Sequence, residues 1–236
     1  MPKKVKRPAQ KVEEVDRFVL LFERVRTVFV QNWRLFTIGF VIVALVVVVT
    51  FLWMRNLQRR EKYASFLLFQ GVTKLQEAGD LTGEEGGSAY NEALTTLSAL
   101  VDEYGGTESG KLGLLYRGKC LSRLKRYGEA IEQYEAFLSL DESSQLYRSL
   151  ALKSLGFAYE NEKEYEKALG CFKELTEMEE SFLRGESILA QGRIYEEMGQ
   201  QKEALDVYRT FLEQYPDSPQ SDRIQRKVAL IEAAIR

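Results

Sequence analysis

The sequence predicts an all-α protein with one N-terminal transmembrane helix, an α-solenoid of stacked helix pairs and a C-terminal capping helix. Two observations support this prediction. Residues 35–54 form an uncharged apolar run, and three segments that begin with glycine repeat one pattern at intervals of 38 and 36 residues. A run of that length is typical of a membrane span, and a repeat period of that size is typical of a solenoid.

The uncharged run has the composition expected of a transmembrane helix. It reads LFTIGFVIVALVVVVTFLWM from Leu35 to Met54 and lies between Arg34 and Arg55. At about 1.5 Å per residue, roughly 20 apolar residues cross a hydrocarbon core of about 30 Å. Trp33 and Trp53 stand near its ends, where amphipathic rings favour lipid headgroups. The alternative is a buried helix of a large globular core, although such helices usually carry some polar residues.

The segment before the run is basic, with nine Lys/Arg against four Asp/Glu in residues 1–34, a net charge of +5. We expect residues 1–15 to form a disordered basic tail and residues 16–32 to form an amphipathic helix. The apolar face of this helix comprises Phe18, Phe22, Val25 and Phe29. Such a stripe with basic flanks suits a helix lying in the membrane interface. A helix docked on a partner or on the protein's own domain is the alternative.

The flanking charges leave the orientation of the run open. Four arginines lie close to it on the N-terminal side, in positions 15–34, and five Lys/Arg lie on the C-terminal side, in positions 55–74. The extended tail adds five more Lys/Arg to the N-terminal side, so it favours a cytoplasmic N-terminus. Because the sequence MRNLQRR follows in place of a small-residue cleavage site, we expect an uncleaved signal anchor.

Composition argues against several classes of function. Residues 55–236 hold 24 Lys/Arg against 31 Asp/Glu, net −7, which disfavours binding dominated by nucleic-acid phosphates. The chain has no histidine, which removes His-dependent triads and most zinc chemistry. Cys120 and Cys171 cannot form a disulfide scaffold, and buried inert thiols are favoured over a redox pair. We therefore expect a non-enzyme with no metal, no cofactor, no small-molecule substrate and no nucleic-acid partner.

Three segments of the domain share one pattern, beginning at Gly118, Gly156 and Gly192. In each, an alanine follows twelve residues after the glycine and an aromatic residue four further on. These positions are Ala130 and Tyr134, Ala168 and Phe172, and Ala204 and Tyr208. Each segment is expected to form two antiparallel helices, with glycine and alanine where the helices approach closely and the aromatics between neighbours. A glycine inside a helix costs roughly 1 kcal/mol relative to alanine, so its recurrence indicates a packing role.

This pattern resembles the tetratricopeptide repeat, whose unit is about 34 residues. Tyr159 and Tyr195, three residues after their glycines, and Pro216 at the end of the third unit also match, whereas Leu121 departs from the pattern. A degenerate fourth unit is expected before them, with an acidic, glycine-rich loop over residues 80–88. The expected repeat domain covers residues 57–236, with units near 59–105, 111–144, 149–182 and 185–218 and a cap over 219–236.

Taken whole, the chain is similar to the YfgM-like ancillary subunits of the Sec translocon, a bacterial envelope family. The resemblance rests on VEEVDRF, QNWRLFTIGF and LVDEYGGTESGKLGLLYRG, while FLEQYPDSPQSD resembles joins in envelope repeat proteins of the BamD and CpoB type. It implies a single-pass inner-membrane protein with a cytoplasmic N-terminus and a periplasmic repeat domain. That domain would be a scaffold that contacts the translocon, envelope-assembly components, exported polypeptides or periplasmic chaperones.

Two other functions stay open at this point. One is a membrane-anchored adaptor whose repeats face the cytoplasm and bind a soluble partner. The other is a subunit that presents substrates to a separate enzyme.

The partner-binding surface is expected on the first helices of the units, which line the concave face of such a solenoid. By register, its outward positions are Leu115, Lys119, Arg123, Lys153, Phe157, Glu160, Leu189, Arg193 and Glu196. Their mixture of apolar and charged side chains suits a polypeptide better than a single small molecule. The dicarboxylate clamp of chaperone-binding tetratricopeptide domains is not reproduced, since only Lys153 fits it. An ordinary solvated face is the alternative.

Overall fold

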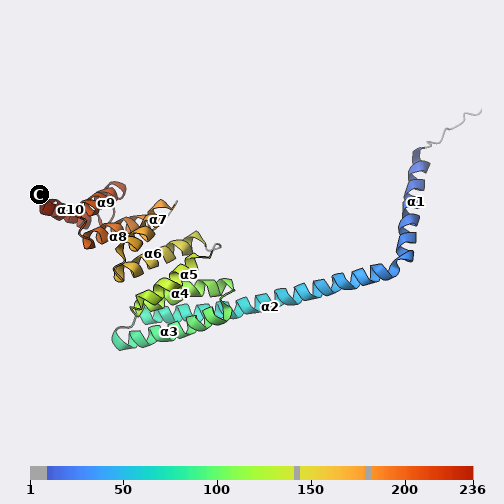
Figure 1. The fold of residues 1–236 in the computed structure, drawn as a ribbon, viewed down its shortest axis with the longest axis horizontal. Helices are drawn as coiled ribbons and strands as arrows, with labels where there is room; N and C mark the ends of the chain where they lie inside the picture. Colours follow the sequence, from blue (N-terminus) through green and yellow to red (C-terminus); the bar gives the residue numbers. More distant parts are fainter. Residues whose placement is uncertain (1–9, 141–143, 179–181, 236) are drawn as a thin grey trace, which may run out of the picture. The chain divides into compact units, whose positions relative to one another are not determined.

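The computed structural model describes residues 10–140, 144–178 and 182–235, and within these ranges it contains ten helices and no strand (Figure 1). The helices are α1 (Gln10–Gln31), α2 (Trp33–Gly79), α3 (Gly83–Tyr104), α4 (Glu108–Arg123), α5 (Tyr127–Leu138), α6 (Gln145–Asn161), α7 (Tyr165–Glu177), α8 (Arg184–Glu197), α9 (Gln201–Gln214) and α10 (Ser221–Ile235). The all-α prediction is confirmed. The chain divides into two compact units, Met1–Gln58 and Arg59–Arg236.

The first unit contains α1 and the first part of α2. Residues 35–54 lie within α2, and all of their side chains are exposed. Among the residues that the structure describes, α2 is the one helix long and apolar enough to cross a membrane. Since no described residue covers the run, the alternative of a helix buried in a globular core is disfavoured.

The expected disordered tail of residues 1–15 is too long, because α1 begins at Gln10. Residues 10–15 contain no proline or glycine, whereas Pro2 and Pro8 precede them, and proline is tolerated only in the first turn of a helix. Residues 1–9 lie outside the described part of the chain. The amphipathic helix expected over residues 16–32 corresponds to the rest of α1, which ends at Gln31.

The second unit is a solenoid of helix pairs. The last part of α2 packs against α3 through Ala64, Ala93 and Leu97, and the pairs α4–α5, α6–α7 and α8–α9 follow, each contacting the next (Figure 1). These pairs correspond to the four expected units, and α10 packs on α9 at the position expected for the cap. The first helices begin one to four residues before the expected unit boundaries, at Glu108, Gln145 and Arg184.

Each repeat glycine lies against the aromatic side chain of its own repeat. A Cβ atom on Gly118 would lie 2.6 Å from Tyr134, one on Gly156 would lie 2.8 Å from Phe172, and one on Gly192 would lie 2.4 Å from Tyr208. The three aromatic side chains are almost fully buried. The sequence predicted close approach of the helices at these glycines, and the distances show it.

The loop expected over residues 80–88 is largely helical, because α3 begins at Gly83. Its acidic residues Glu84 and Glu85 lie in the first turn, where negative charge favours the positive end of the helix dipole. Gly86 is buried, and a Cβ atom there would lie 2.9 Å from the carbonyl oxygen of Leu81. A composition that suggested a solvated loop therefore forms a packed helix N-terminus.

Two charged side chains at the start of the second unit hold α2 to the turn between α3 and α4. The Glu61 carboxylate accepts hydrogen bonds from the backbone N–H groups of Glu108 (3.0 Å) and Ser109 (3.1 Å) and from the Ser109 hydroxyl (2.6 Å). Arg60 donates to the carbonyl oxygen of Glu103 at 3.0 Å. Glu61 thus satisfies free N–H groups at the positive end of α4. Arg60 donates to a free carbonyl oxygen at the negative end of α3.

Candidate binding groove

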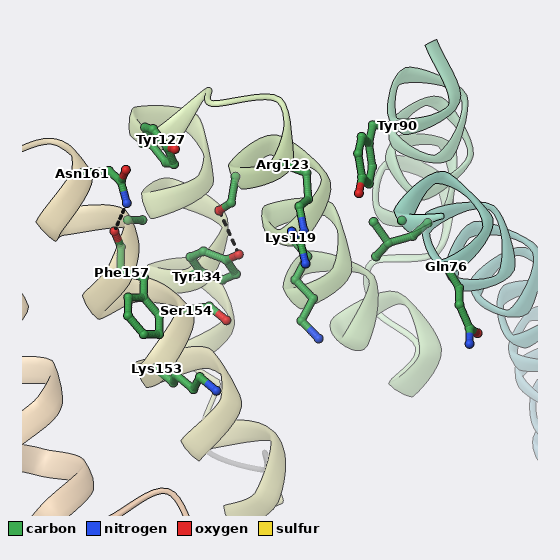
Figure 2. Close-up of a pocket in the computed structure, with 14 residues that line it drawn as sticks. Gln76, Tyr90, Lys119, Arg123, Tyr127, Tyr134, Lys153, Ser154, Phe157 and Asn161 are labelled. Carbon is green, nitrogen blue, oxygen red and sulfur yellow. Dashed lines mark hydrogen bonds between the residues drawn. The ribbon is translucent and has the colours of Figure 1, made fainter. Parts of the chain in front are cut away.

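A groove of about 610 Å³ lies in the second unit, between the first two helices of the solenoid and the first helices of the next two repeats (Figure 2). We call it the groove. Its lining comes from α2 to α6: Leu75, Gln76, Gly79, Tyr90, Lys119, Ser122, Arg123, Tyr127, Tyr134, Lys153, Ser154, Phe157, Ala158 and Asn161. The groove therefore joins residues that are as much as 86 positions apart in the chain.

Four of the residues predicted to face a partner line the groove: Lys119, Arg123, Lys153 and Phe157. Glu160 and Arg193 line a second depression, of about 410 Å³, which shares Phe157 and Asn161 with the groove. Glu196 is half-buried and pairs with Lys227 of the capping helix. The structure thus places most of the predicted positions along one continuous surface.

Two predicted positions, Leu115 and Leu189, are not on that surface. Their side chains are 0% and 7% exposed and belong to the hydrophobic core. Both stand three residues before the repeat glycine, as Lys153 does. An aliphatic side chain at this position stays in the core, whereas the long lysine side chain extends past it and places its ammonium group 2.8 Å from Glu186. The prediction for the two leucines is wrong, because register alone does not tell a buried aliphatic side chain from a long charged one at the same repeat position.

Ion pairs join consecutive repeats along this surface. Arg193 donates two hydrogen bonds to the Glu160 carboxylate, at 2.6 and 2.7 Å, and lies over the Phe157 ring at 5.5 Å. The bond to Glu160 raises the pKa of Arg193 above its usual value. One repeat further on, Lys227 donates to Glu196 at 2.6 and 2.8 Å. Glu160 and Glu196 both lie four residues after their repeat glycine, so the two ion pairs recur at the same repeat position. We call the pairs Glu160–Arg193 and Glu196–Lys227 the ion-pair ladder.

The groove carries three cations. Lys153 is paired with Glu186, whereas Lys119 lies over the Tyr116 ring at 5.2 Å. Burial lowers the pKa of Lys119, and the positive charges of Lys153 and Arg123 lower it further. Over the described ranges, no carboxylate forms an ion pair with Lys119 or Arg123. This part of the domain is therefore a local positive region in a unit that is acidic overall.

Hydroxyl and amide groups line the groove beside these cations. The Ser122 hydroxyl and the Tyr134 hydroxyl lie 3.1 Å apart and share a hydrogen bond, and Asn161 donates to the Phe157 carbonyl at 2.7 Å. Figure 2 shows the Tyr134 hydroxyl on the side of its ring that is nearer to Lys119. Aromatic faces, hydroxyl groups and cations together can bind the backbone and side chains of a polypeptide.

Comparison with known proteins decides the family. Residues 26–232 match the family described as tetratricopeptide repeat-like domain, which is well over half of the chain. The chain belongs to this family. A curated relative, the photosystem I assembly protein Ycf3 of Prochlorococcus marinus, is 38% identical over 65 residues, 27% of this chain and 38% of that protein. The chain thus spans well under half the length of that relative.

Solved structures share the tetratricopeptide repeat-like fold. A crystal structure of MamA is 18% identical, with a TM-score of 0.52 over 62% of this chain and 79% of that chain. A protein described as a kinesin light chain of Podosopora anserina, with nearly identical TPR-like repeats, is 17% identical, with a TM-score of 0.58 over 72% and 87%. At these identities the likeness establishes the fold alone.

Several groove residues of this tetratricopeptide repeat-like protein escaped the sequence reasoning. Tyr127 is the first residue of α5 and Asn161 is the last residue of α6, at positions of clear repeats that register could have supplied. Gln76 and Tyr90 belong to the degenerate first unit, whose packed glycine, Gly71, lies against Leu97 and so departs from the glycine-to-aromatic spacing by which the other units were aligned. Their approach to Lys119 and Arg123 depends on how α2 and α3 pack, which no local pattern encodes.

The two cysteines are expected to resist thiol reagents in the folded protein. Cys120 and Cys171 are buried and unpaired by any disulfide, and burial raises the pKa of each thiol to about 12. Since the thiolate is the reactive form, labelling by iodoacetamide near pH 8 should be slow until urea unfolds the domain. Mass spectrometry of native and unfolded samples measures this, and rapid native labelling at either cysteine would contradict it.

The same burial gives a pH dependence of stability. An unfolded thiol ionises with a pKa of about 8.5, so the folded state holds a proton that the unfolded state releases above that pH. The stabilisation is therefore complete below about pH 8.5 and is lost as pH rises toward the folded value of about 12. Alanine in place of each cysteine should flatten this part of the stability profile.

Proposed function

We propose that this protein is a membrane-anchored periplasmic scaffold that binds exported polypeptides or chaperones, at the translocon or at an envelope-assembly complex. Its tetratricopeptide repeat-like fold is that of a protein-interaction scaffold. The observation that carries the proposal is the groove, in which the side chains of five helices converge on one open space (Figure 2).

The membrane attachment is supported by the exposed apolar run of α2. Every side chain of residues 35–54 is exposed, and a run of this length buried in hydrocarbon satisfies all of its backbone hydrogen bonds as a helix. Leaving so large an apolar surface in water would promote aggregation. The bilayer is the environment that removes this surface from water.

The periplasmic location is supported by the basic N-terminal tail and by the resemblance to the YfgM-like subunits. A reporter fused after residue 236 tests it. Alkaline phosphatase, which is active only when exported, should be active in that fusion, and green fluorescent protein in its place should be dark when exported by the Sec route. A fusion that lacks residues 35–54 should show the reverse pattern.

The opposite orientation has one specific observation in its favour, namely the five Lys/Arg in positions 55–74 that closely follow the run. In that arrangement the protein is a cytoplasmic adaptor. Inactive phosphatase together with a fluorescent C-terminal protein would support this second function and eliminate the first.

The translocon role calls for a separate experiment in intact cells. The photo-crosslinking residue p-benzoylphenylalanine is placed at Asn161, which is exposed at the edge of the groove, and in a second variant at Lys173, which is exposed on α7. We expect crosslinks to Sec components or periplasmic chaperones from Asn161 and none from Lys173. Recovery of no such partner from Asn161 would eliminate the translocon version.

A further inference from the structure

The ion-pair ladder is interrupted at the junction that forms the groove. At the junction of the second and third clear repeats, Glu160 forms an ion pair with Arg193. Glu160 stands four residues after the glycine of its repeat, and Arg193 stands one residue after the glycine of the next. The same register at the junction of the first and second clear repeats holds Ser122 and Phe157. A serine and a phenylalanine cannot form the ion pair, so no carboxylate–guanidinium contact joins these two positions beside the groove.

Two cations near this junction have no internal counter-charge among the described residues. Lys119 and Arg123 line the groove, and neither forms an ion pair within the described part of the chain. The charged groups that face Lys119 are Lys153 and Arg123, both positive, and the Glu186 carboxylate is already bound to Lys153. Lys119 is half-buried whereas Arg123 is exposed, so it is mainly the charge of Lys119, partly removed from water, that the binding of an opposite charge would stabilise.

The walls around these cations are apolar and aromatic. Phe157 and Tyr90 stand on opposite sides of the groove in Figure 2, with Lys119 between them, and Leu75 also lines it. Phe157 is half-buried, so one part of its ring remains available. A side chain of a bound segment can pack there while a neighbouring carboxylate reaches the cations.

We propose that the groove binds an extended segment of a partner polypeptide in which carboxylate side chains flank an apolar residue. The inference rests on the proposed scaffold function and specifies the chemistry of its client. A carboxylate of the client lies beside Lys119 and Arg123, near position 122, where the ion-pair ladder would have a glutamate and this chain has a serine. The apolar residue packs against Phe157.

The charge of the domain distinguishes this client from other anionic partners. Residues 55–236 carry a net charge of −7, so a nucleic acid, which needs many phosphate contacts along its length, meets repulsion around the groove. A short acidic segment requires only the two cations inside it. The residues involved also differ from the chaperone-binding dicarboxylate clamp, of which this chain retains only Lys153.

The test compares two peptides that differ only in charge. The full chain in a non-ionic detergent is titrated calorimetrically with acetyl-Glu-Glu-Phe-Glu-Glu-amide and with acetyl-Gln-Gln-Phe-Gln-Gln-amide. We expect the Glu peptide to bind about tenfold more tightly, the size typical of one charge-assisted contact. Raising NaCl from about 0.05 to about 0.5 M should weaken the Glu peptide strongly and the Gln peptide little.

Matched variants assign the preference to the groove. Lys119→Gln combined with Arg123→Gln should reduce the Glu-over-Gln ratio to about one, whereas Lys173→Gln on α7 should leave it unchanged. Ser122→Glu supplies a tethered carboxylate at the ladder position, so it should weaken the Glu peptide without removing either cation. Circular dichroism confirms that each variant is folded, and the salt dependence of the wild-type protein provides a readout that needs no variant.

Three results would overturn the inference: equal affinity for the two peptides, a preference that survives the double variant, or tighter binding of a Lys counterpart peptide. None of them would refute the scaffold at the translocon, which is tested separately by the crosslinks from Asn161. If the Glu peptide dissociates a dimer of the chain, the acidic segment that occupies the groove belongs to a second copy of the chain. The proposal of a separate client is then wrong.

Discussion

Replacing Gly192 with alanine is expected to lower the free energy of unfolding of the solenoid by about 2–3 kcal/mol. The new methyl group would lie 2.4 Å from the ring of Tyr208, which is 1% exposed and cannot move aside without displacing its own neighbours. Overpacking of a well-packed core typically costs about 1–3 kcal/mol. Because a contact of 2.4 Å is far shorter than a real Cβ atom makes, the gross cost here lies above the upper end of that range, and the better helix propensity of alanine offsets about 1 kcal/mol of it. Thermal unfolding of the full chain in detergent, followed by circular dichroism, measures the difference.

Gly170→Ala is the matched control. Gly170 lies inside α7, is exposed, and has no atom within 4 Å of the position that a Cβ would occupy. The same substitution should therefore raise stability there, by up to about 1 kcal/mol. If the two variants change the unfolding midpoint in the same direction and to the same extent, close packing against Tyr208 is not the reason for the repeat glycine.

Replacing Glu61 with alanine is expected to destabilise the first repeats by about 2 kcal/mol. The substitution removes three hydrogen bonds to a charged acceptor and leaves the N–H groups of Glu108 and Ser109 without their partner. Hydrogen bonds to charged groups contribute about 1.5–3 kcal/mol each, but water can replace part of the loss at Glu108, which is exposed, although less at Ser109, which is buried. Hydrogen exchange at the start of α4 should increase more than exchange in α8 and α9.

Glu77→Ala on the same helix is the control for Glu61. Glu77 is exposed, and its side chain forms no ion pair within the described ranges. Substitution there should leave exchange at α4 unchanged. Glu61→Gln should be intermediate, because the amide keeps one acceptor oxygen but loses the charge. Uniform acceleration of exchange along the whole solenoid in Glu61→Ala would show that the contact has no local capping role.

The fold was predictable because its determinants are local. The glycine, the alanine and the aromatic residue of each repeat lie within a span of seventeen residues, and Gly192 and Tyr208 meet inside one helix pair. The capping contact of Glu61 was not predictable, since its partners follow 47 and 48 residues later. No pattern in the sequence relates these positions, and only the packing of α2 on the following turn joins them.

The groove was predictable only in part. The register of the first helices indicated Lys119, Arg123, Lys153 and Phe157, which line the groove, but it also indicated Leu115 and Leu189, which are buried in the core. Helical periodicity gives the direction of a side chain to within a fraction of a turn, and at such borderline positions the length and polarity of the side chain decide its burial. An ion pair across this junction would need a carboxylate in place of Ser122, a residue that no motif distinguishes.

The contact pattern of the solenoid has a consequence for where it opens. Each helix pair packs mainly on its neighbours in the chain, so its cooperativity is that of a one-dimensional array, in which local opening begins at an end and decays inward. At the C-terminal end, α10 packs on α9 and leaves Leu230 71% exposed. Helices α7, α8 and α9 act as a buffer, since fraying of α10 must pass through them before it reaches α6, the last helix that lines the groove. A partner can therefore bind to a site that stays formed while the far end of the array opens and closes.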